Sequence, residues 1–207
     1  VNDVISHGIP YSYDLQEGDL LYIDTGIQVD GLCGDAGLTI PIGEVSNADQ
    51  RLLRFARGAL YKGIEAIKPS AKVTDVGEAI ESFALRSGYK VNKKFWGHGI
   101  GRTMHEDPKI PHFQLPPEEI KTEVKPGKFK YEYKDSEGVP VFEVGQVVCI
   151  EPMLTKGRDD FGAPDSDGWT YRTRDGKKSA FFEHMVRVTP EGHEILTTHI
   201  REVSENV

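Results

Sequence analysis

The stretch GDLLYIDTGIQVDGLCGDAGLTIPI, residues 18–42, determines the fold because it has the pattern of two strands joined by a tight turn. Apolar runs at residues 20–23 and 38–42 flank the dipeptide Asp30-Gly31, and Asp-Gly is a strong signal for a two-residue hairpin turn. In such a hairpin the numbers of facing residues add up to a constant, so Asp35 lies opposite Gly26. The stretch therefore predicts a β-hairpin with a defined register.

Two carboxylates, those of Asp24 and Asp35, are predicted to share one face of this hairpin. Side chains alternate between the two faces of a strand, and the register places Asp24 diagonal to Asp35, about 7 Å away. Both residues have apolar neighbours in the sequence, where like charges raise each other's pKa unless a cation neutralises them. Taken singly, either residue could instead face solvent or cap a turn, since aspartate is usually exposed.

Two amphipathic helices are predicted after the hairpin. Apolar residues at spacings of three and four fill residues 48–67, with Ser46 as the N-cap. A second apolar face covers residues 76–84, with Thr74 as the expected N-cap and Gly88 as the C-terminal stop.

The second half is predicted to consist of strands and loops. The segment YKVNKKFW from residue 89 has the character of a strand, and so do the apolar runs 147–150 and 180–188. A loop rich in proline and charge follows residue 110, and a hairpin is predicted within about residues 113–142. We therefore expect an α+β fold.

A metal site is the chemistry that the polar residues of these strands favour. His98 lies in the glycine-rich segment FWGHGIGRTMHEDP, Glu151 ends one apolar strand, and Glu183 interrupts another. Together with Asp24 and Asp35 they supply four carboxylates and an imidazole, which suit divalent cations, and bridging carboxylates favour two ions. Singly, the histidine could be a satisfied core residue and each glutamate a salt-bridged strand residue.

Composition excludes several classes of function. A net charge of −8 without a basic cluster argues against nucleic-acid binding. No apolar run approaches 18 residues and no signal peptide is visible, so we expect neither a membrane span nor secretion. The two cysteines, Cys33 and Cys149, are too few for a disulfide framework, and we expect buried free thiols and a cytoplasmic location.

Five segments resemble, in the same order, the signature segments of the type I methionine aminopeptidases, which have the pita-bread metallopeptidase fold. They are VNDVISHGIP, YIDTGIQVDGLCGDAGLT, GHGIGRTMHEDP, CIEPML and DGWTYRTRDGKKSAFFEH. The resemblance implies an antiparallel sheet flanked by helices, with pseudo-twofold halves. On this basis we expect residues 1–207 to form a single catalytic domain with halves at about 1–90 and 91–207.

The resemblance also implies the ligands of a dinuclear metal centre. The metal ligands would be Asp24, Asp35, His98, Glu151 and Glu183, with Asp35 and Glu183 bridging the ions. Ligands of this kind accept Mn, Fe, Co or Zn. The implied reaction is removal of an N-terminal methionine by attack of hydroxide on the scissile carbonyl, with Glu151 as general base and then general acid.

The same resemblance assigns residues to substrate binding. His7 and His105 would contact the substrate and the tetrahedral intermediate, and Met104 and Trp169 would line the pocket for the methionine side chain. Simple core packing is the alternative for Met104. The substrates would be the N-termini of peptides and nascent proteins. Residues 113–142 are longer than the usual link in this family. This hairpin insertion would be a flap over the cleft, a contact for the ribosome or an inert addition.

Members of this family normally carry helices and a first strand ahead of the NDVISHGIP motif, which we do not find. We expect a partial sequence that lacks this N-terminal segment, or else a compact variant with a more open pocket. Two alternative functions are considered. The first is an aminopeptidase or prolidase that acts on X-Pro bonds, against which the HGIP and DGWT segments argue. The second is a catalytically weak, metal-free binding relative, against which the retention of all five ligands argues.

Overall fold

The predicted hairpin forms with the predicted register. Strand β2 (Leu20–Val29) pairs with β3 (Leu32–Pro41), and Gly26 lies opposite Asp35. The two residues between the strands have φ angles of 50° and 78°, the left-handed conformation that a two-residue turn of this kind needs. The Asp-Gly pair therefore fixes which side chains share a face of the hairpin.

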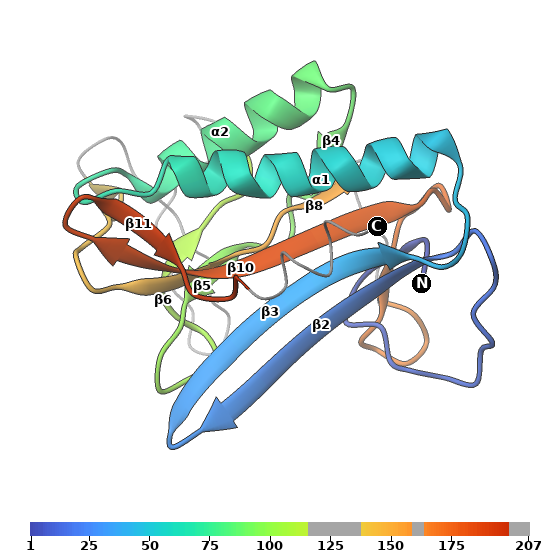
Figure 1. Ribbon diagram of the computed structural model, residues 1–207, viewed down its shortest axis with the longest axis horizontal. Coiled ribbons are helices and arrows are strands. Elements are labelled where there is room, and N and C mark those ends of the chain that lie inside the picture. The colour runs from blue at the N-terminus through green and yellow to red at the C-terminus, as the bar shows by residue number, and fades with distance from the viewer. Residues whose placement is uncertain (116–137, 159–163, 199–207) are drawn as a thin grey trace.

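The computed structural model describes residues 1–115, 138–158 and 164–198, which form an antiparallel sheet with two helices on one face (Figure 1). The other strands are β1 (Val4–Ser6), β4 (Lys90–Val91), β5 (Gly97–Gly99), β6 (Glu106–Ile110), β7 (Val147–Ile150), β8 (Met153–Thr155), β9 (Tyr171–Arg172), β10 (Ser179–Thr189) and β11 (Gly192–Ile195). The main sheet has the order β2-β3-β10-β7-β5-β6, with β11 and β8 also paired to β10, and β4 to β8. Strands β1 and β9 pair separately. The α+β class is confirmed.

The two helices begin and end close to the predicted residues. Helix α1 covers Asn47–Glu65, and the Ser46 hydroxyl accepts the Asp49 N–H, as an N-cap does. Helix α2 covers Val73–Arg86, so the prediction of Thr74 as its N-cap was wrong. Asp75 explains the earlier start, because its carboxylate accepts the Lys72 N–H at 3.0 Å and thereby caps the helix from inside.

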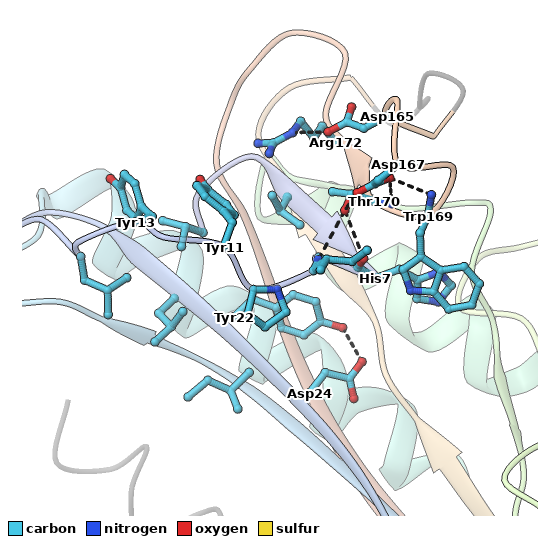
Figure 2. A pocket seen from close by; sticks show the side chains of 18 residues that line it. His7, Tyr11, Tyr13, Tyr22, Asp24, Asp165, Asp167, Trp169, Thr170 and Arg172 are labelled. Carbon is cyan, nitrogen blue, oxygen red and sulfur yellow. Dashed lines mark hydrogen bonds and ion pairs between the residues drawn. The ribbon is translucent and has the colours of Figure 1, made fainter.

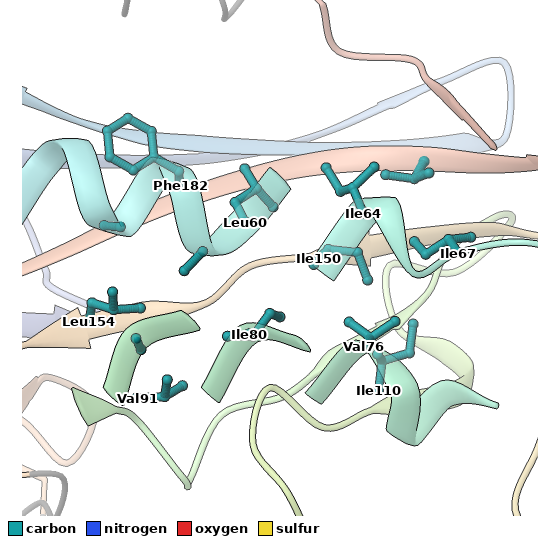
Figure 3. Close-up of a cluster of buried hydrophobic side chains, with 14 of the residues drawn as sticks. Leu60, Ile64, Ile67, Val76, Ile80, Val91, Ile110, Ile150, Leu154 and Phe182 are labelled. Atoms are coloured by element: carbon teal, nitrogen blue, oxygen red, sulfur yellow. The ribbon is translucent and has the colours of Figure 1, made fainter. Parts of the chain in front are cut away.

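The hydrophobic core lies between the helices and the sheet (Figures 1 and 3). Leu60 of α1 and Ile80 of α2 are buried in the same cluster as Ile150 of β7 and Phe182 of β10. Side chains alternate along a strand, so the even-numbered residues of β7 and β10 face the helices. Their odd-numbered residues face the other way, which determines where polar side chains can gather.

Two predictions for the second half need correction or lie outside the described residues. The expected strand from residue 89 is only two residues long in β4, because the Asn92 side chain accepts the N–H groups of Lys94 and Phe95 and turns the chain. Residues 116–137, most of the predicted hairpin insertion, are not described. At its end, Val141 forms an isolated bridge with Lys72. None of the described helices is long and apolar enough to cross a bilayer.

Helix α2 approaches a loop so closely that only glycine fits at one position. A Cβ on Gly77 would lie 2.5 Å from the Phe113 carbonyl oxygen and 2.8 Å from that of Pro111. Gly77→Ala is therefore expected to lower the free energy of unfolding by about 1–3 kcal/mol. Helix propensity alone would raise it by about 1 kcal/mol. Urea unfolding of both proteins measures the difference.

Gly58→Ala in α1 is the matched control. A Cβ there would meet only ring atoms of Phe83, the nearest at 2.8 Å, and a side chain can move aside more easily than backbone. We expect Gly58→Ala to lower the free energy of unfolding by less than Gly77→Ala does. A Gly77→Ala variant that is more stable than the parent protein would show that the loop can move to accommodate the added methyl group.

Candidate metal centre

The face of the sheet opposite the helices collects the polar strand residues. Cys149 of β7 lies opposite His98 of β5 and opposite Met185 of β10, and Glu183 of β10 lies opposite Gly37 of β3. Directly paired residues put their side chains on the same face. Pairing across four strands therefore brings His98, Cys149 and Glu183 together.

The hairpin adds two carboxylates to this face. Asp24 pairs with Gly37, and Asp35 pairs with Gly26, so both side chains emerge on the side of Glu183, as the register predicted. The Asp35 side chain is only 12% exposed. Asp24 is exposed, and its Oδ2 accepts the Tyr22 hydroxyl at 2.9 Å. The pair thus comprises one solvated and one largely buried carboxylate.

Donor atoms converge at the centre of this face. His98 Nε2 lies 3.4 Å from Glu151 Oε1 and 3.9 Å from Asp35 Oδ2. Single donor atoms of Asp35, His98, Cys149 and Glu183 all lie within 4.8 Å of one another. Glu183 is 2% exposed, yet its Oε1 has no hydrogen-bond partner among the described residues. A buried carboxylate oxygen without a donor fits a divalent cation at this position.

The protein backbone orients the imidazole of His98. Its Nδ1 lies 2.9 Å from the Gly99 carbonyl oxygen, which can only accept, so Nδ1 carries the proton and Nε2 keeps its lone pair. Burial lowers the pKa of His98 to about 4, so the ring is neutral at pH 7. The lone pair therefore points toward Glu151 and Asp35, as a metal ligand requires.

Glycines on both sides of His98 allow neighbouring strands to approach. A Cβ on Gly97 would lie 2.3 Å from the Cys149 carbonyl oxygen, and one on Gly99 would lie 2.2 Å from that of Asp107. Any side chain at these positions would push β5 away from β7 or β6. The glycine-rich motif is thus a packing requirement of the strand that carries His98.

The carboxylates raise each other's pKa. Burial, followed by the charge of Asp24, raises the pKa of Asp35 to about 6. Burial also raises the pKa of Glu151 and of Glu183 well above the usual value, and the neighbouring carboxylates add to both shifts. Lys109, opposite His98 on β6, partly offsets the shift of Glu151. One ammonium group does not neutralise this cluster, so its charge favours a bound cation.

His112 contacts the site and was missed in the sequence, where it fell in a segment assigned to loop. Its ring is buried, and its Nε2 accepts the N–H of Glu151 at 3.2 Å. Burial lowers the pKa of His112 to about 3, which keeps Nε2 available as an acceptor. His112 therefore holds the backbone of Glu151 where strand β7 ends. Its position between two prolines and an aromatic residue gives no recognisable signal.

The two histidines predicted to contact substrate lie around the donor cluster. The His105 ring centroid is 4.4 Å from that of His98. His7 stacks on Trp169 with ring centroids 4.8 Å apart, and Phe95 meets the His7 ring edge-on. Burial, followed by the positive charges of Lys109 and then His7, lowers the pKa of His105, and the negative charge of Asp24 partly offsets this shift.

A groove of about 690 Å³ runs from Asp24 along the loop after β1 (Figure 2). His7 and Trp169 lie at one end, and Tyr11 and Tyr13 line the loop side. Trp169 is 57% exposed, which leaves its ring available for contact. The groove has mainly apolar walls, with Asp24 on the hairpin side and Asp165, Asp167 and Arg172 also in its lining. It can accept an apolar side chain next to the cluster of donor atoms.

Met104 lies outside the lining of this groove. A Cβ on Gly26 would come within 2.5 Å of the Met104 methyl carbon, so this side chain packs on Gly26, on the face of the hairpin that also carries Asp35. It is not among the residues that line the groove. The structure therefore brings Trp169 and His7 together at the groove and places Met104 outside its lining, next to Gly26.

Comparisons with known proteins agree with a metal centre. The profile of metallopeptidase family M24 matches residues 1–190. Methionine aminopeptidase 1 of Bacillus subtilis is 36% identical over 95% of this chain and 71% of its own length. Methionine aminopeptidase A of Synechocystis is 40% identical over 95% of this chain and 70% of its own.

Solved structures show the same relationship. The crystal structure of methionine aminopeptidase from Rickettsia prowazekii aligns with a TM-score of 0.81 at 35% identity, covering 95% of this chain and 71% of that one. Prolidase from Pyrococcus furiosus aligns with a TM-score of 0.66 at 20% identity, covering 92% and 44%, which shows a shared fold only. The pita-bread fold is confirmed by these neighbours.

Removing one carboxylate should change how stability depends on pH. The pKa of Asp35 is about 6 in the folded protein against an ordinary 3.8, so the folded state binds more protons between these values and loses stability as pH rises through them. The lowered pKa of His98 makes stability rise with pH instead, but His98 is present both in the parent and in an Asp35→Asn variant. Asp35→Asn should therefore gain stability over the parent as pH rises from 4 to 7, when both are free of metal.

Urea unfolding of chelator-treated protein at several pH values measures this difference. Adding a divalent metal at pH 7 should reverse the order, because only the parent keeps the full ligand set and binding stabilises the folded state. A stability difference that is the same at every pH would contradict the assigned burial of Asp35.

Proposed function

The chain belongs to metallopeptidase family M24, and from this premise we propose that it is a metal-dependent aminopeptidase that removes the N-terminal methionine from peptides and proteins. The observation that carries the proposal is the buried cluster of Asp35, His98 and Glu183, with Glu151 beside it. Relatives named methionine aminopeptidase are 36–40% identical, whereas the prolidase neighbour is 20% identical. Hydrolysis of X-Pro bonds is therefore not favoured.

We propose that the cluster holds two divalent ions, with Mn, Fe, Co and Zn as candidates. Their ligands would be Asp24, Asp35, His98, Glu151 and Glu183, with Asp35 and Glu183 shared between the ions. Bound divalent ions supply a water of lowered pKa and polarise a carbonyl group. The uncompensated carboxylates and the unpaired Glu183 oxygen support this ligand set.

Glu151 is proposed to move the proton during hydrolysis. It follows the last residue of β7, and its backbone N–H is fixed by His112, so its carboxylate has a defined position. Its raised pKa suits a group that accepts a proton from water and then passes it to the departing amine. Glu183 is buried deeper, and its Oε1 has no hydrogen-bond partner in the described part of the chain, so it is less able to exchange protons with substrate.

His105 and His7 are proposed to bind the substrate. His105 lies next to His98, where a ring N–H can donate to the oxygen on which negative charge develops. His7 is held against Trp169 at the end of the groove and would orient the peptide beyond the scissile bond. Trp169 would then contact the methionine side chain. The position of Met104 against Gly26 supports a packing role at least as well as a place in this pocket.

We propose that residues 1–207 act as one catalytic unit, because the ligands come from both predicted halves. Asp24 and Asp35 belong to residues 1–90, whereas His98, Glu151 and Glu183 belong to residues 91–207. Nascent-chain N-termini in the cytoplasm are the proposed substrates in the cell, and a contact with the ribosome is a further proposal for the insertion.

The proposed function predicts a defined peptide specificity. Purified protein loaded with Mn, Fe, Co or Zn should release methionine from Met-Ala-Ser and leave Ala-Pro peptides intact, as followed by amino-acid analysis. A chelator should abolish the activity, and metal should restore it. Cleavage of only the Ala-Pro peptide would replace the proposal with an X-Pro peptidase.

Glu151→Gln should lower kcat by about 100-fold to 10,000-fold, because an amide cannot shuttle the proton. Glu143→Gln is the matched control, since Glu143 is exposed in a turn before β7 and should leave kcat unchanged. Metal content is measured for both variants, so that loss of an ion is separated from loss of proton transfer. A fully metallated Glu151→Gln variant with normal kcat would exclude the role.

A further inference from the structure

Cys149 occupies a position that the proposed ligand set does not use. It lies at the middle of β7, directly opposite His98 on one side and Met185 on the other, and is fully buried. Its neighbours Val148 and Ile150 face the helix-side core, so the Cys149 side chain points to the face that carries the carboxylates. The sequence predicted a buried free thiol, and the structure places that thiol among candidate ligands.

The distances allow sulfur to bind an ion in this cluster. Cys149 Sγ and the donor atoms of Asp35, His98 and Glu183 lie within 4.8 Å of one another. An ion at the centre of a tetrahedron with edges of that length would lie about 2.9 Å from each donor, compared with about 2.0–2.3 Å in zinc sites. Each donor therefore needs to move by less than about 1 Å.

A second observation points to an ion at this position. The Glu183 carboxylate is 2% exposed, its Oε1 has no hydrogen-bond partner among the described residues, and a donor oxygen of the same group belongs to the cluster. A buried carboxylate oxygen without a donor is costly unless a cation binds it. The cation that satisfies Glu183 would also be within reach of Cys149 Sγ.

We propose that Cys149 Sγ is a direct ligand of the ion held by Asp35, His98 and Glu183, which gives this centre a sulfur donor in addition to its oxygen and nitrogen donors. On binding, the S–H bond breaks, the sulfur forms a bond to the metal, and the proton leaves to the buffer. The inference rests on the metal centre of the proposed function. Thiolate favours softer ions, so the site should take Zn, Co or Fe in preference to Mn or Mg.

The competing role for the thiol is the hydrogen bond that it makes to the Glu183 carboxylate. Serine can donate the same hydrogen bond but supplies no sulfur, so Cys149→Ser separates the two roles. Cys33→Ser is the matched control, because Cys33 lies on β3 two residues from Asp35 and outside the cluster. Both variants are compared with the parent after full loading with one metal.

X-ray absorption spectroscopy of zinc-loaded protein tests the bond directly. The parent and Cys33→Ser should show one sulfur at about 2.3 Å from zinc, and Cys149→Ser should show none. Cobalt-loaded protein should show a thiolate-to-cobalt charge-transfer band that only Cys149→Ser loses. Cys149→Ser should also weaken zinc binding by about 10-fold or more, with a smaller effect on manganese.

Two failures can be told apart by counting bound metal and assaying Met-Ala-Ser. A parent protein that binds stoichiometric metal with only oxygen and nitrogen ligands, and cleaves the peptide, overturns the sulfur ligand and leaves the proposed function intact. A parent protein that binds no metal and cleaves nothing overturns both.

Discussion

Mutual repulsion among buried carboxylates is the constraint on which this structure depends. Burial raises the pKa of Asp35, Glu151 and Glu183, and neighbouring carboxylates, Asp24 among them, raise each of these values further. Such a group is costly without a cation, and Lys109 supplies a single positive charge beside it. The hydrophobic core between the two helices and the sheet must therefore stabilise the metal-free protein. A bound cation would relieve this repulsion, which would couple metal binding to folding.

The alternation of side chains along antiparallel strands is what keeps these two regions apart. On β7 and β10, even-numbered residues such as Ile150 and Phe182 pack under the helices, while Cys149 and Glu183 face the opposite side. A shift of one residue in any pairing would send the carboxylates into the core and the apolar groups into the cleft. The tight turn of the hairpin fixes this register at one end of the sheet.

The sequence was sufficient where the decisive contacts are local or periodic. The Asp-Gly turn gave the hairpin register, spacing gave both helices, and the apolar run at residues 147–150 gave the bounds of β7. It was insufficient where contacts join distant segments. The hydrogen bond of His112 to Glu151 spans 39 residues, and the place of Cys149 depends on pairing with two strands. The start of α2 was missed because Asp75 caps it from the first turn.

One glycine shows how the motif and the site depend on each other. A Cβ on Gly97 would touch both the Cys149 carbonyl oxygen, at 2.3 Å, and the His112 Nε2, at 3.0 Å. The close approach of Gly97 to the Cys149 carbonyl oxygen allows β5 to pair with β7. The space next to Gly97 also holds the His112 ring, which accepts the N–H of Glu151. Because Gly97 has no side chain, β5 and β7 can pair closely, and this pairing brings His98, Cys149 and Glu151 together. Glycine is required here because the backbone of β7 and the ring of His112 leave no space for a side chain on β5.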